Sequence, residues 1–235
     1  MKISIIVPVF NAASTLEACI RSVLTQTHDD IDIIVRDGGS TDGGLAILDA
    51  VNDDRLDWKS EPDEGLYDAM NKGTCAASGD WVLYLGADDY LADSEVLENV
   101  ARELERCDPR IGLACGQIRY ESGRVFKSTA KGMIFRNRIH HQSAFYRRQV
   151  CLDHPYRKEY RISADYDLNC YCVRAAGGAF EFNYLVAICG EVGLSKQASW
   201  SGYREEIEAR HRYFPWFPSI VFDAGTYLRY WRKKI

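Results

Sequence analysis

The sequence contains no apolar stretch approaching the roughly 20 residues that a membrane-spanning helix requires. Its first residues, MKISIIVPVF, also lack the long apolar core of a secretory signal peptide. Eight cysteines are present, but they are scattered and none belongs to a C-x-x-C pair. This pattern is typical of buried, reduced thiols rather than of a disulfide framework. We therefore expect a cytoplasmic protein without a transmembrane segment.

Two common nucleotide-binding signatures are missing as well. No G-x-G-x-x-G follows the first apolar run, and no G-x-x-x-x-G-K-S/T occurs anywhere. These absences make a dinucleotide-binding fold and a P-loop fold weak interpretations. The formal net charge of −5 gives no electrostatic reason to expect a nucleic acid partner. The 46% apolar and 27% charged residues are ordinary for a globular protein, and 235 residues are enough for one sizeable domain.

Over the first 110 residues, strand patterns alternate with helix patterns. Near-continuous apolar runs predict strands covered on both faces, and apolar residues spaced three and four apart predict the helices between them. Ser14 and Glu17 form an S-x-x-E capping box predicted to begin the first helix, and Asp42 is predicted to open the second. The alternation predicts a parallel sheet with helices on both faces. The predicted strands are 3–9, 31–35, 56–59 and 81–85, and the later helices are about 65–77 and 94–107.

The pattern changes after residue 110. A hairpin about Ser122-Gly123 is predicted, and the elements after it are a strand at 142–146, a helix at 164–176, a strand at 179–186 and two amphipathic segments at 200–213 and 216–232. We therefore predict an α/β fold whose Rossmann-like, mostly parallel sheet is flanked by helices and continues into a mixed C-terminal half. Its predicted parts are a nucleotide-binding half at 1–110, an acceptor-side half of the same domain at 111–199, and a C-terminal helical extension at 200–235.

Small and acidic residues follow each of the four predicted strands of the first half. In an open parallel sheet, ligands bind beyond the carboxyl ends of the strands. A single Asp-Gly is usually an ordinary turn, but here four consecutive strands direct such residues to one edge. We interpret this edge as the wall of a nucleotide pocket. The four segments are Pro8-Val9-Phe10-Asn11, Asp37-Gly38-Gly39-Ser40-Thr41-Asp42, Glu61-Pro62-Asp63-Glu64-Gly65 and Gly86-Ala87-Asp88-Asp89.

Asp88 and Asp89 are adjacent carboxylates at the end of a buried strand. Such a pair is costly unless a cation lies beside it. Mg²⁺ and Mn²⁺ prefer carboxylate oxygens and bind alongside phosphates. We therefore expect Mn²⁺ or Mg²⁺ at Asp88 and Asp89, next to a phosphate-bearing ligand. Asp37, at the base of the glycine-rich loop, is expected to accept hydrogen bonds from a base or sugar.

Several of these segments together resemble one enzyme family. SIIVPVFNAASTLEACIRSVLTQT, IIVRDGGSTDGG, SEPDEGLYDAMNKG and GDWVLYLGADDYL resemble, in order and spacing, the family 2 glycosyltransferases of the GT-A fold. HHQSAFYRR and RISADYDL continue the resemblance to about residue 190. The resemblance implies the GT-A fold and inverting transfer of a hexosyl or N-acetylhexosaminyl group. The implied donor is a nucleotide-diphospho-sugar, with a UDP-sugar favoured.

The resemblance also implies roles for individual residues. Asp165 in SADYDL matches the general base, and Ala164 stands where the family often has Glu. A carboxylate is needed there because the acceptor hydroxyl has a pKa far above 7. In GADD the first Asp of the longer D-x-D-D form is absent, so Asp88 is expected to face the ribose or diphosphate and Asp89 to ligate the metal. The implied nucleotide-sugar contacts are Pro8, Val9, Asn11, Asp37, Asp63, Asp88, His141 and Gln142.

Other interpretations stay open. A sugar nucleotidyltransferase also presents carboxylates to a metal and phosphates, but PVFNAAST lacks the glycine and basic residues of its signature. A catalytically silent nucleotide-sugar-binding module is weakened because Asp88, Asp89 and Asp165 are all present. Lys72 either reaches a phosphate or is a solvated helix lysine. GEVGLS, at 190–195, resembles a family loop that closes over the donor.

The acceptor is expected to be a saccharide or a lipid-linked saccharide in bacterial surface polysaccharide assembly. The C-terminal segment WFPSIVFDAGTYLRYWRKKI mixes aromatic residues with Arg229, Arg232, Lys233 and Lys234. This segment is either a packed helix with a solvated end or a peripheral contact with an anionic membrane. The second interpretation places the protein at the inner face of the cell membrane.

Overall fold

The computed structural model describes residues 1–190 and 200–234, without the side chains of 216–218 and 233–234. The predicted donor-closing segment GEVGLS lies outside these residues except for Gly190. The strands are β1 (Ile3–Val9), β2 (Ile31–Asp37), β3 (Leu56–Ser60), β4 (Trp81–Tyr84), β5 (Tyr90–Leu91), β6 (Leu113–Tyr120), β7 (Val125–Lys127), β8 (Ala144–Arg147) and β9 (Ala179–Cys189). The helices are α1 (Ala13–Leu24), α2 (Gly44–Asp49), α3 (Leu66–Ala76), α4 (Val96–Glu105), α5 (Arg148–Asp153), α6 (Ala164–Ala175), α7 (Trp200–Tyr213) and α8 (Trp216–Lys234), with a 3-10 turn, η1, at His141–Ser143.

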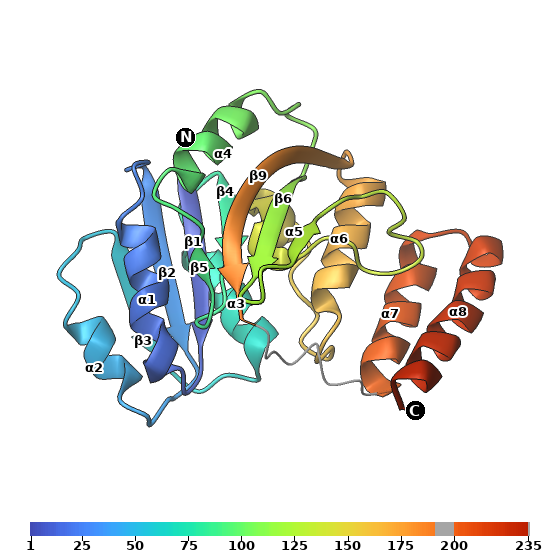
Figure 1. The fold of residues 1–235 in the computed structure, drawn as a ribbon, viewed down its shortest axis with the longest axis horizontal. Helices are drawn as coiled ribbons and strands as arrows, with labels where there is room; N and C mark the ends of the chain where they lie inside the picture. The colour runs from blue at the N-terminus through green and yellow to red at the C-terminus, as the bar shows by residue number, and fades with distance from the viewer. Residues whose placement is uncertain (191–199, 235) are drawn as a thin grey trace.

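One sheet runs through the chain, in the order β3-β2-β1-β4-β8-β6-β9-β5, with β7 paired to β6 (Figure 1). The first four strands in this order are parallel to one another, as the β-α alternation predicted. Strand β8 joins β4 antiparallel, and β6 pairs antiparallel with β8 but parallel with β9. The predicted α/β fold, with a mixed C-terminal half continuing the same sheet, is confirmed.

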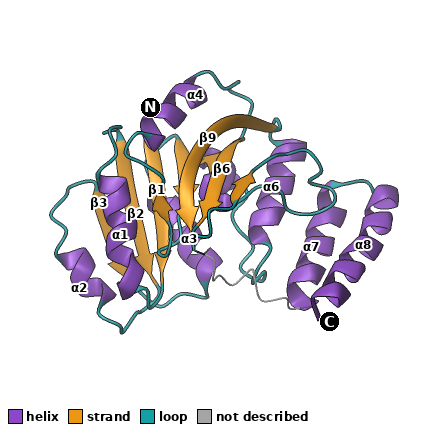
Figure 2. Cartoon of the chain, in the orientation of Figure 1, coloured by secondary structure: helices purple, strands orange, loops and turns teal. Residues whose placement is uncertain are grey.

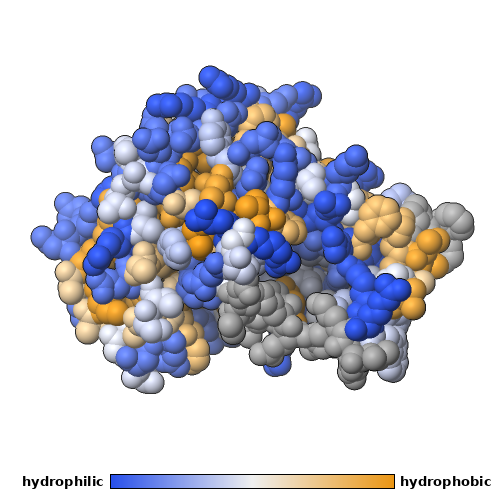
Figure 3. Space-filling view, viewed as in Figure 1, coloured by the Kyte–Doolittle hydropathy of each residue, from blue (hydrophilic) through white to orange (hydrophobic). Residues whose placement is uncertain are grey.

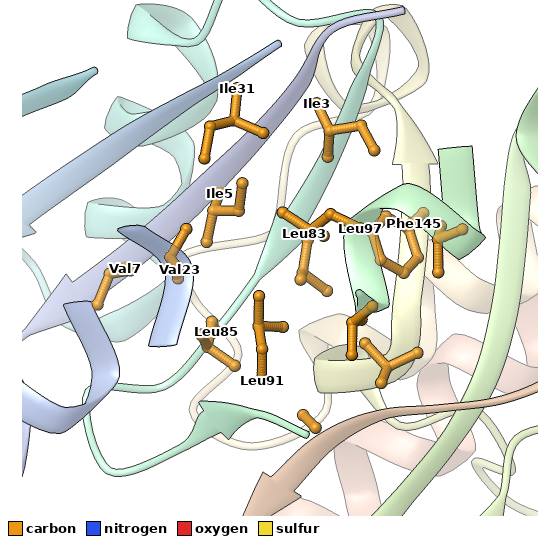
Figure 4. Packing of buried hydrophobic residues seen from close by; sticks show 14 of the residues in the cluster. Ile3, Ile5, Val7, Val23, Ile31, Leu83, Leu85, Leu91, Leu97 and Phe145 are labelled. Atoms are coloured by element: carbon orange, nitrogen blue, oxygen red, sulfur yellow. The ribbon is translucent and has the colours of Figure 1, made fainter. Parts of the chain in front are cut away.

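Helices cover both faces of the sheet, because alternate side chains of its buried strands point to opposite sides (Figure 2). On β1, Ile3 and Ile5 belong to a core cluster that also contains residues of α1, α2 and α4. Ile6 points the other way, into a cluster formed with residues of α3, α5 and α6. Figure 4 shows the first cluster, where side chains of β1 and β4 lie against Val23 of α1 and Leu97 of α4. Both faces of the central strands are therefore buried.

Two predicted helix starts are wrong. Helix α1 begins at Ala13, and no side chain caps it from its own N-terminus, so Ser14 and Glu17 do not form a capping box. Asp42 does not open α2, which begins at Gly44. Its carboxylate instead accepts hydrogen bonds from the Ala13 amide at 2.7 Å and the Gly44 amide at 3.1 Å. One acidic side chain thus serves free amide groups of two helices, an arrangement that only the folded chain creates.

Further predictions concern the cysteines, membrane helices and one strand. All eight thiols are free, and seven of them are buried. Burial raises the pKa of Cys115 and of Cys151 to about 12, so both remain protonated.

Among the described residues, none of the helices combines the length and apolar character needed to span a bilayer. The strand predicted from residue 142 begins only at Ala144, because the residues before it form η1.

Helix α3 packs so closely on β1 that Gly73 is predicted to be essential for stability. A Cβ at this position would lie 2.4 Å from Cγ2 of the buried Ile6. Gly73→Ala is therefore expected to lower the free energy of unfolding by about 1–3 kcal/mol through overpacking. Urea denaturation would measure this change.

Gly225 of α8 supplies the matched control, because a Cβ there meets nothing within 4 Å. Gly225→Ala is expected to stabilise the protein by up to about 1 kcal/mol, the usual helix-propensity gain. If Gly73→Ala were stabilising to the same extent, the close packing of α3 on β1 would be contradicted.

Candidate active site

The glycine-rich loop after β2 is folded around Asp37. Its buried carboxylate accepts hydrogen bonds from the Gly39 amide at 2.9 Å, from the Ser40 amide at 3.0 Å and from the Ser60 hydroxyl at 2.6 Å, and also from the Ser40 hydroxyl. Burial alone would raise the pKa of Asp37, but these hydrogen bonds outweigh it and hold the pKa below its usual value. The four donors fill most of the acceptor capacity of a carboxylate. Asp37 therefore shapes the loop, and its predicted contact with a base or sugar remains a prediction.

The end of β1 is tied to the same loop. The Asn11 amide donates to the Ser40 hydroxyl at 2.7 Å, and the Asn11 side-chain oxygen accepts from the Thr41 amide at 3.0 Å. Asn11 adopts a left-handed backbone conformation with φ of 49°, which Asn tolerates better than most residues. The glycine-rich loop therefore fixes Asn11 in position, and its contact with the donor remains a prediction.

Sequence reasoning missed Phe10 in this region. Pro8 and Val9 are buried, so these two predicted contacts can offer only backbone atoms to a ligand. Phe10 next to them is 66% exposed, the largest exposed fraction among the large apolar side chains of the described residues. An apolar residue directly after a buried strand, where a polar turn residue is normal, was the available signal.

Asp63, from the loop between β3 and α3, lies against the glycine-rich loop. Its carboxylate accepts from the Gly65 amide at 2.8 Å. A Cβ at Gly38 would lie 2.5 Å from Asp63 Oδ2, so the two loops touch. The structure thus brings Asn11, Asp37 and Asp63 to the carboxyl ends of β1, β2 and β3, the edge where ligands bind in open parallel sheets.

Lys72 on α3 is also engaged by the protein. Its ammonium group lies 3.1 Å from an Asp68 carboxylate oxygen and donates to the Pro62 carbonyl at 3.0 Å. These contacts hold the loop between β3 and α3 onto the helix. Lys72 is therefore partly engaged by the protein, and its contact with a phosphate remains a prediction.

Asp88 and Asp89 follow β4 and differ in exposure. Asp88 is exposed, whereas Asp89 is only 3% exposed. Asp89 Oδ2 accepts from the Gln142 amide nitrogen at 2.8 Å, and Oδ1 accepts from the Gly190 amide at 3.2 Å. Burial, followed by the neighbouring charge of Asp88, raises the pKa of Asp89. An ionised Asp89 therefore calls for a nearby positive charge.

The carboxylates of Asp88 and Asp89 both approach Gly86. A Cβ there would lie 2.6 Å from Asp89 Oδ2 and 2.8 Å from Asp88 Oδ1, so a larger residue than glycine would displace them. Among residues 1–190 and 200–234, no group of three or more His, Cys, Asp or Glu side chains is arranged to hold a metal. Two carboxylates are nevertheless sufficient for Mg²⁺ or Mn²⁺ when substrate phosphates supply further oxygens.

The turn η1 connects this carboxylate pair with Asp165. Gln142 bonds to Asp89, while Nδ1 of the adjacent His141 lies 3.9 Å from Asp165 Oδ2. Two predicted contact residues, neighbours in sequence, therefore reach the two predicted chemical centres. Asp89 and Asp165 are brought to either side of one short turn.

A hydrogen bond with His140 fixes the orientation of the Gln142 side chain. An ionised Asp89 can only accept, so Gln142 turns its NH₂ group toward it and its Oε1 toward His140. Nδ1 of a neutral His140 then carries the proton, and Nε2 accepts from the Tyr120 hydroxyl at 3.2 Å. The paired histidines in the sequence thus have different partners, and sequence reasoning had no signal for the role of His140.

Asp165 stands in the first turn of α6 with its carboxylate held from two sides. Oδ2 accepts from the Asn137 amide nitrogen at 2.9 Å, and Oδ1 accepts from the Tyr166 backbone amide at 2.8 Å. Asn137 is itself fixed, because its Oδ1 accepts from the Ile139 amide at 3.2 Å. Asn137 is a second residue that sequence reasoning missed. The carboxylate therefore has a defined position, and both of these hydrogen-bond donors are neutral amide groups.

Asp167, two residues further, has a different environment. It is buried and forms ion pairs with Arg212, His154 and Arg157. These partners attach α6 to α7 and to the segment after α5. The carboxylate of Asp167 is therefore engaged in helix packing.

The comparisons with known proteins decide the family. The model of glycosyl transferase family 2 matches residues 4–183. The chain belongs to this family. Membership favours glycosyl transfer over nucleotidyl transfer. The match includes all the candidate site residues named in this subsection except Gly190.

Related sequences and structures agree with this family assignment. PGL/p-HBAD biosynthesis glycosyltransferases of Mycobacterium bovis and Mycobacterium tuberculosis are 39% identical over 178 residues, which cover 72% of this chain and 68% of theirs. S. aureus TarS superposes with a TM-score of 0.74 at 20% identity, over 89% of this chain and 64% of the TarS chain. The mannosyltransferase PcManGT of Pyrobaculum calidifontis, in complex with GDP-Man and Mn²⁺, gives 0.69 at 19% identity, over 96% of this chain and 69% of that one. This glycosyltransferase therefore has the GT-A fold, and its chain spans about two thirds of the length of these relatives.

The environment of Asp167 generates a stability prediction. Asp167→Asn is expected to lower the free energy of unfolding at neutral pH by roughly 1–3 kcal/mol, because buried hydrogen bonds to charged groups are weakened. Burial would raise the pKa of Asp167, but the His154 hydrogen bond and the charges of Arg212 and Arg157 hold it below its usual value. Stabilisation from a lowered carboxyl pKa is present above about pH 4 and is lost as the pH falls through the folded-state value.

Urea denaturation of wild type and variant at neutral and acidic pH measures both effects. The wild type should lose more stability on acidification than Asp167→Asn, which has no carboxyl group to protonate there. Asp165→Asn is the matched control in the same helix turn and should change stability little. Equal acid sensitivity of the wild type and Asp167→Asn would contradict the ion-pair role.

Proposed function

We propose that this glycosyltransferase performs metal-dependent, inverting transfer of a hexosyl or N-acetylhexosaminyl group from a nucleoside-diphospho-sugar, with a UDP-sugar favoured. The observation that carries the proposal is η1, which places Gln142 on Asp89 and His141 beside Asp165. A donor held by its diphosphate at Asp88 and Asp89 would have its sugar near this turn. A base at Asp165 would then lie across the turn from the leaving group.

The donor side of the site is built from rigid loops. Asn11, Asp37 and Asp63 surround the glycine-rich loop, where we propose that the base and ribose bind, with Phe10 beside them as an apolar surface. TarS in complex with UDP-GlcNAc and PcManGT in complex with GDP-Man are neighbours in fold, which supports a nucleotide-sugar donor. We propose that Asp88, which is exposed, faces the ribose or diphosphate. The buried Asp89 is proposed to bind Mn²⁺ or Mg²⁺.

The acceptor side needs a base and a means of keeping it in place. In the proposed reaction Asp165 removes the proton of the acceptor hydroxyl as the oxygen attacks the anomeric carbon on the face opposite the diphosphate, which inverts the configuration. Asn137 and the Tyr166 amide hold the carboxylate in position. When bound, the divalent cation supplies Lewis-acid stabilisation of the charge on the departing diphosphate.

We propose that the acceptor is a saccharide or lipid-linked saccharide of bacterial surface polysaccharide assembly, used at the inner face of the cell membrane. The mycobacterial relatives named as PGL/p-HBAD biosynthesis glycosyltransferases support a bacterial glycosyl transfer reaction. A release assay separates the alternatives. A transferase frees nucleoside diphosphate, a nucleotidyltransferase frees pyrophosphate, and a silent module frees neither.

Asp165→Asn tests the base. The variant should lose transfer by about 10²-fold or more, because the amide cannot take the proton, while donor affinity should remain near that of the wild type. Transfer is measured by nucleoside diphosphate release with acceptor present, and donor binding by calorimetry. Substantial residual transfer would reject Asp165 as the base.

Asp89→Asn tests the metal ligand while keeping an oxygen available to the Gln142 amide. Donor affinity in Mn²⁺ should fall by about tenfold or more, because one anionic oxygen of the cation site is lost. The matched control is Asp54→Asn, an exposed aspartate in the loop before β3. Donor binding that responds to Mn²⁺ equally in the wild type and Asp89→Asn would rule out the ligand role.

A further inference from the structure

Exposed apolar side chains gather at the C-terminal end of the molecule. Ten large hydrophobic residues are exposed in the described part of the chain, and six of them lie on α8 or directly beside it. In Figure 3 apolar atoms are visible at the right-hand edge, where α8 lies. We call these six residues the α8 surface. They are Phe135, Ile220, Val221, Tyr227, Leu228 and Trp231.

Helical geometry puts five of them on one face. Residues at 220, 221, 227, 228 and 231 follow the spacing of three, four and seven that aligns side chains along a helix. Val221, Leu228 and Trp231 are 60%, 62% and 59% exposed. An apolar stripe this exposed is the face that a helix normally buries against a protein core, yet the described residues leave it open to solvent.

The opposite face of α8 is fixed to the rest of the protein, so the stripe cannot simply rotate inward. Ser219 and Thr226 are fully buried. Asp223 accepts a hydrogen bond from the fully buried Arg210 of α7 at 2.5 Å and pairs with His211 at 2.6 Å. Asp223 is the sole acidic residue in the sequence of α8. Its charge is therefore directed into the helix pair and away from the α8 surface.

The remaining charges of α8 are all positive. Arg232 is exposed at the end of the stripe, and the sequence places Lys233 and Lys234 directly after it. Arg136, exposed in the loop beside α8, adds a further cation next to Phe135. The whole chain carries a net charge of −5, so this end differs in sign from the protein as a whole. An apolar stripe with cations beside it complements an anionic lipid surface.

We propose that the α8 surface docks on an anionic lipid bilayer, with α8 lying in the plane of the membrane. The stripe would enter the interface while the basic residues contact lipid phosphates. Such a helix binds reversibly, because both the buried apolar area and the charge attraction are modest. The surface itself follows from exposure and charge and does not depend on the proposed glycosyl transfer.

One consequence rests on the proposed function, because the α8 surface is joined to the candidate base by a single loop. Phe135 lies against Phe222 of α8, with ring centroids 4.3 Å apart, and Asn137, two residues later, bonds to Asp165. Arg136 and Arg229 line a recess of about 280 Å³ beside these rings. A lipid-linked acceptor anchored in the docked bilayer would therefore have its phosphates near the recess and its sugar near Asp165.

Vesicle co-sedimentation tests the surface without any substrate. The wild type should bind phosphatidylglycerol vesicles, bind phosphatidylcholine vesicles much less, and release from the former as salt is raised. The affinity of the double variant Val221→Ser/Leu228→Ser for phosphatidylglycerol vesicles should be at least about tenfold lower than that of the wild type, because its apolar stripe is interrupted. Arg232→Glu should also weaken binding to these vesicles.

The matched control is Val125→Ser/Tyr184→Ser, which removes two exposed apolar side chains on β7 and β9, away from α8. The control should sediment with vesicles as the wild type does. Equal loss in the control, or no vesicle binding by the wild type, would overturn the proposal. So would a concentration-dependent dimer in sedimentation velocity that the α8 variant abolishes, because a second copy would then cover the stripe.

Transfer to a water-soluble acceptor separates this proposal from the proposed function. The α8 variant should release nucleoside diphosphate at the wild-type rate with such an acceptor, since the stripe is not part of the donor site or the base. Loss of vesicle binding with intact transfer supports membrane docking. If the wild type binds vesicles but shows no transfer, the docking proposal is supported and the proposed reaction is contradicted.

Discussion

The buried carboxylate of Asp89 imposes the central constraint on this site. It lies beside the charge of Asp88 at the end of a central strand, and burial raises its pKa. Such a group persists only where hydrogen-bond donors or a cation approach it. The donors here come from Gln142, just before β8, and from Gly190, just after β9. The mixed half of the sheet thus brings these segments to the end of β4.

The four aspartates discussed most differ in their surroundings and not in their chemistry. Asp37 accepts hydrogen bonds from amide and hydroxyl groups, which lower its pKa, so it stays ionised and stabilises the glycine-rich loop. Asp167 is neutralised by basic residues and joins helices. Asp89 faces an amide and a second carboxylate, which suits a cation. Asp165 accepts hydrogen bonds from the Asn137 side chain and from an amide of its own helix, which fix its position.

The C-terminal helix pair extends the same logic to the outside of the molecule. Arg210 is fully buried and ties α7 to α8 through Asp223, and its Nη2 also donates to the Phe135 carbonyl at 3.4 Å. The loop that contains Phe135 continues to Asn137 and so to Asp165. One loop therefore contacts both Arg210, which holds α8, and, through Asn137, the candidate base.

The sequence by itself determined the α/β alternation, the confluence of acidic loops at one sheet edge and the family, because strand and helix periods and short motifs are local properties of a chain. Only the tertiary structure decided that Asp42 serves α1 as well as α2, that Asp37 is enclosed by its own loop, and that Phe10 is exposed. It alone decided that Gln142 meets Asp89, 53 residues away, and that Arg212 meets Asp167, 45 residues away. Contacts of this kind depend on strand order and helix packing, and local pattern does not encode which distant partner a polar side chain will meet.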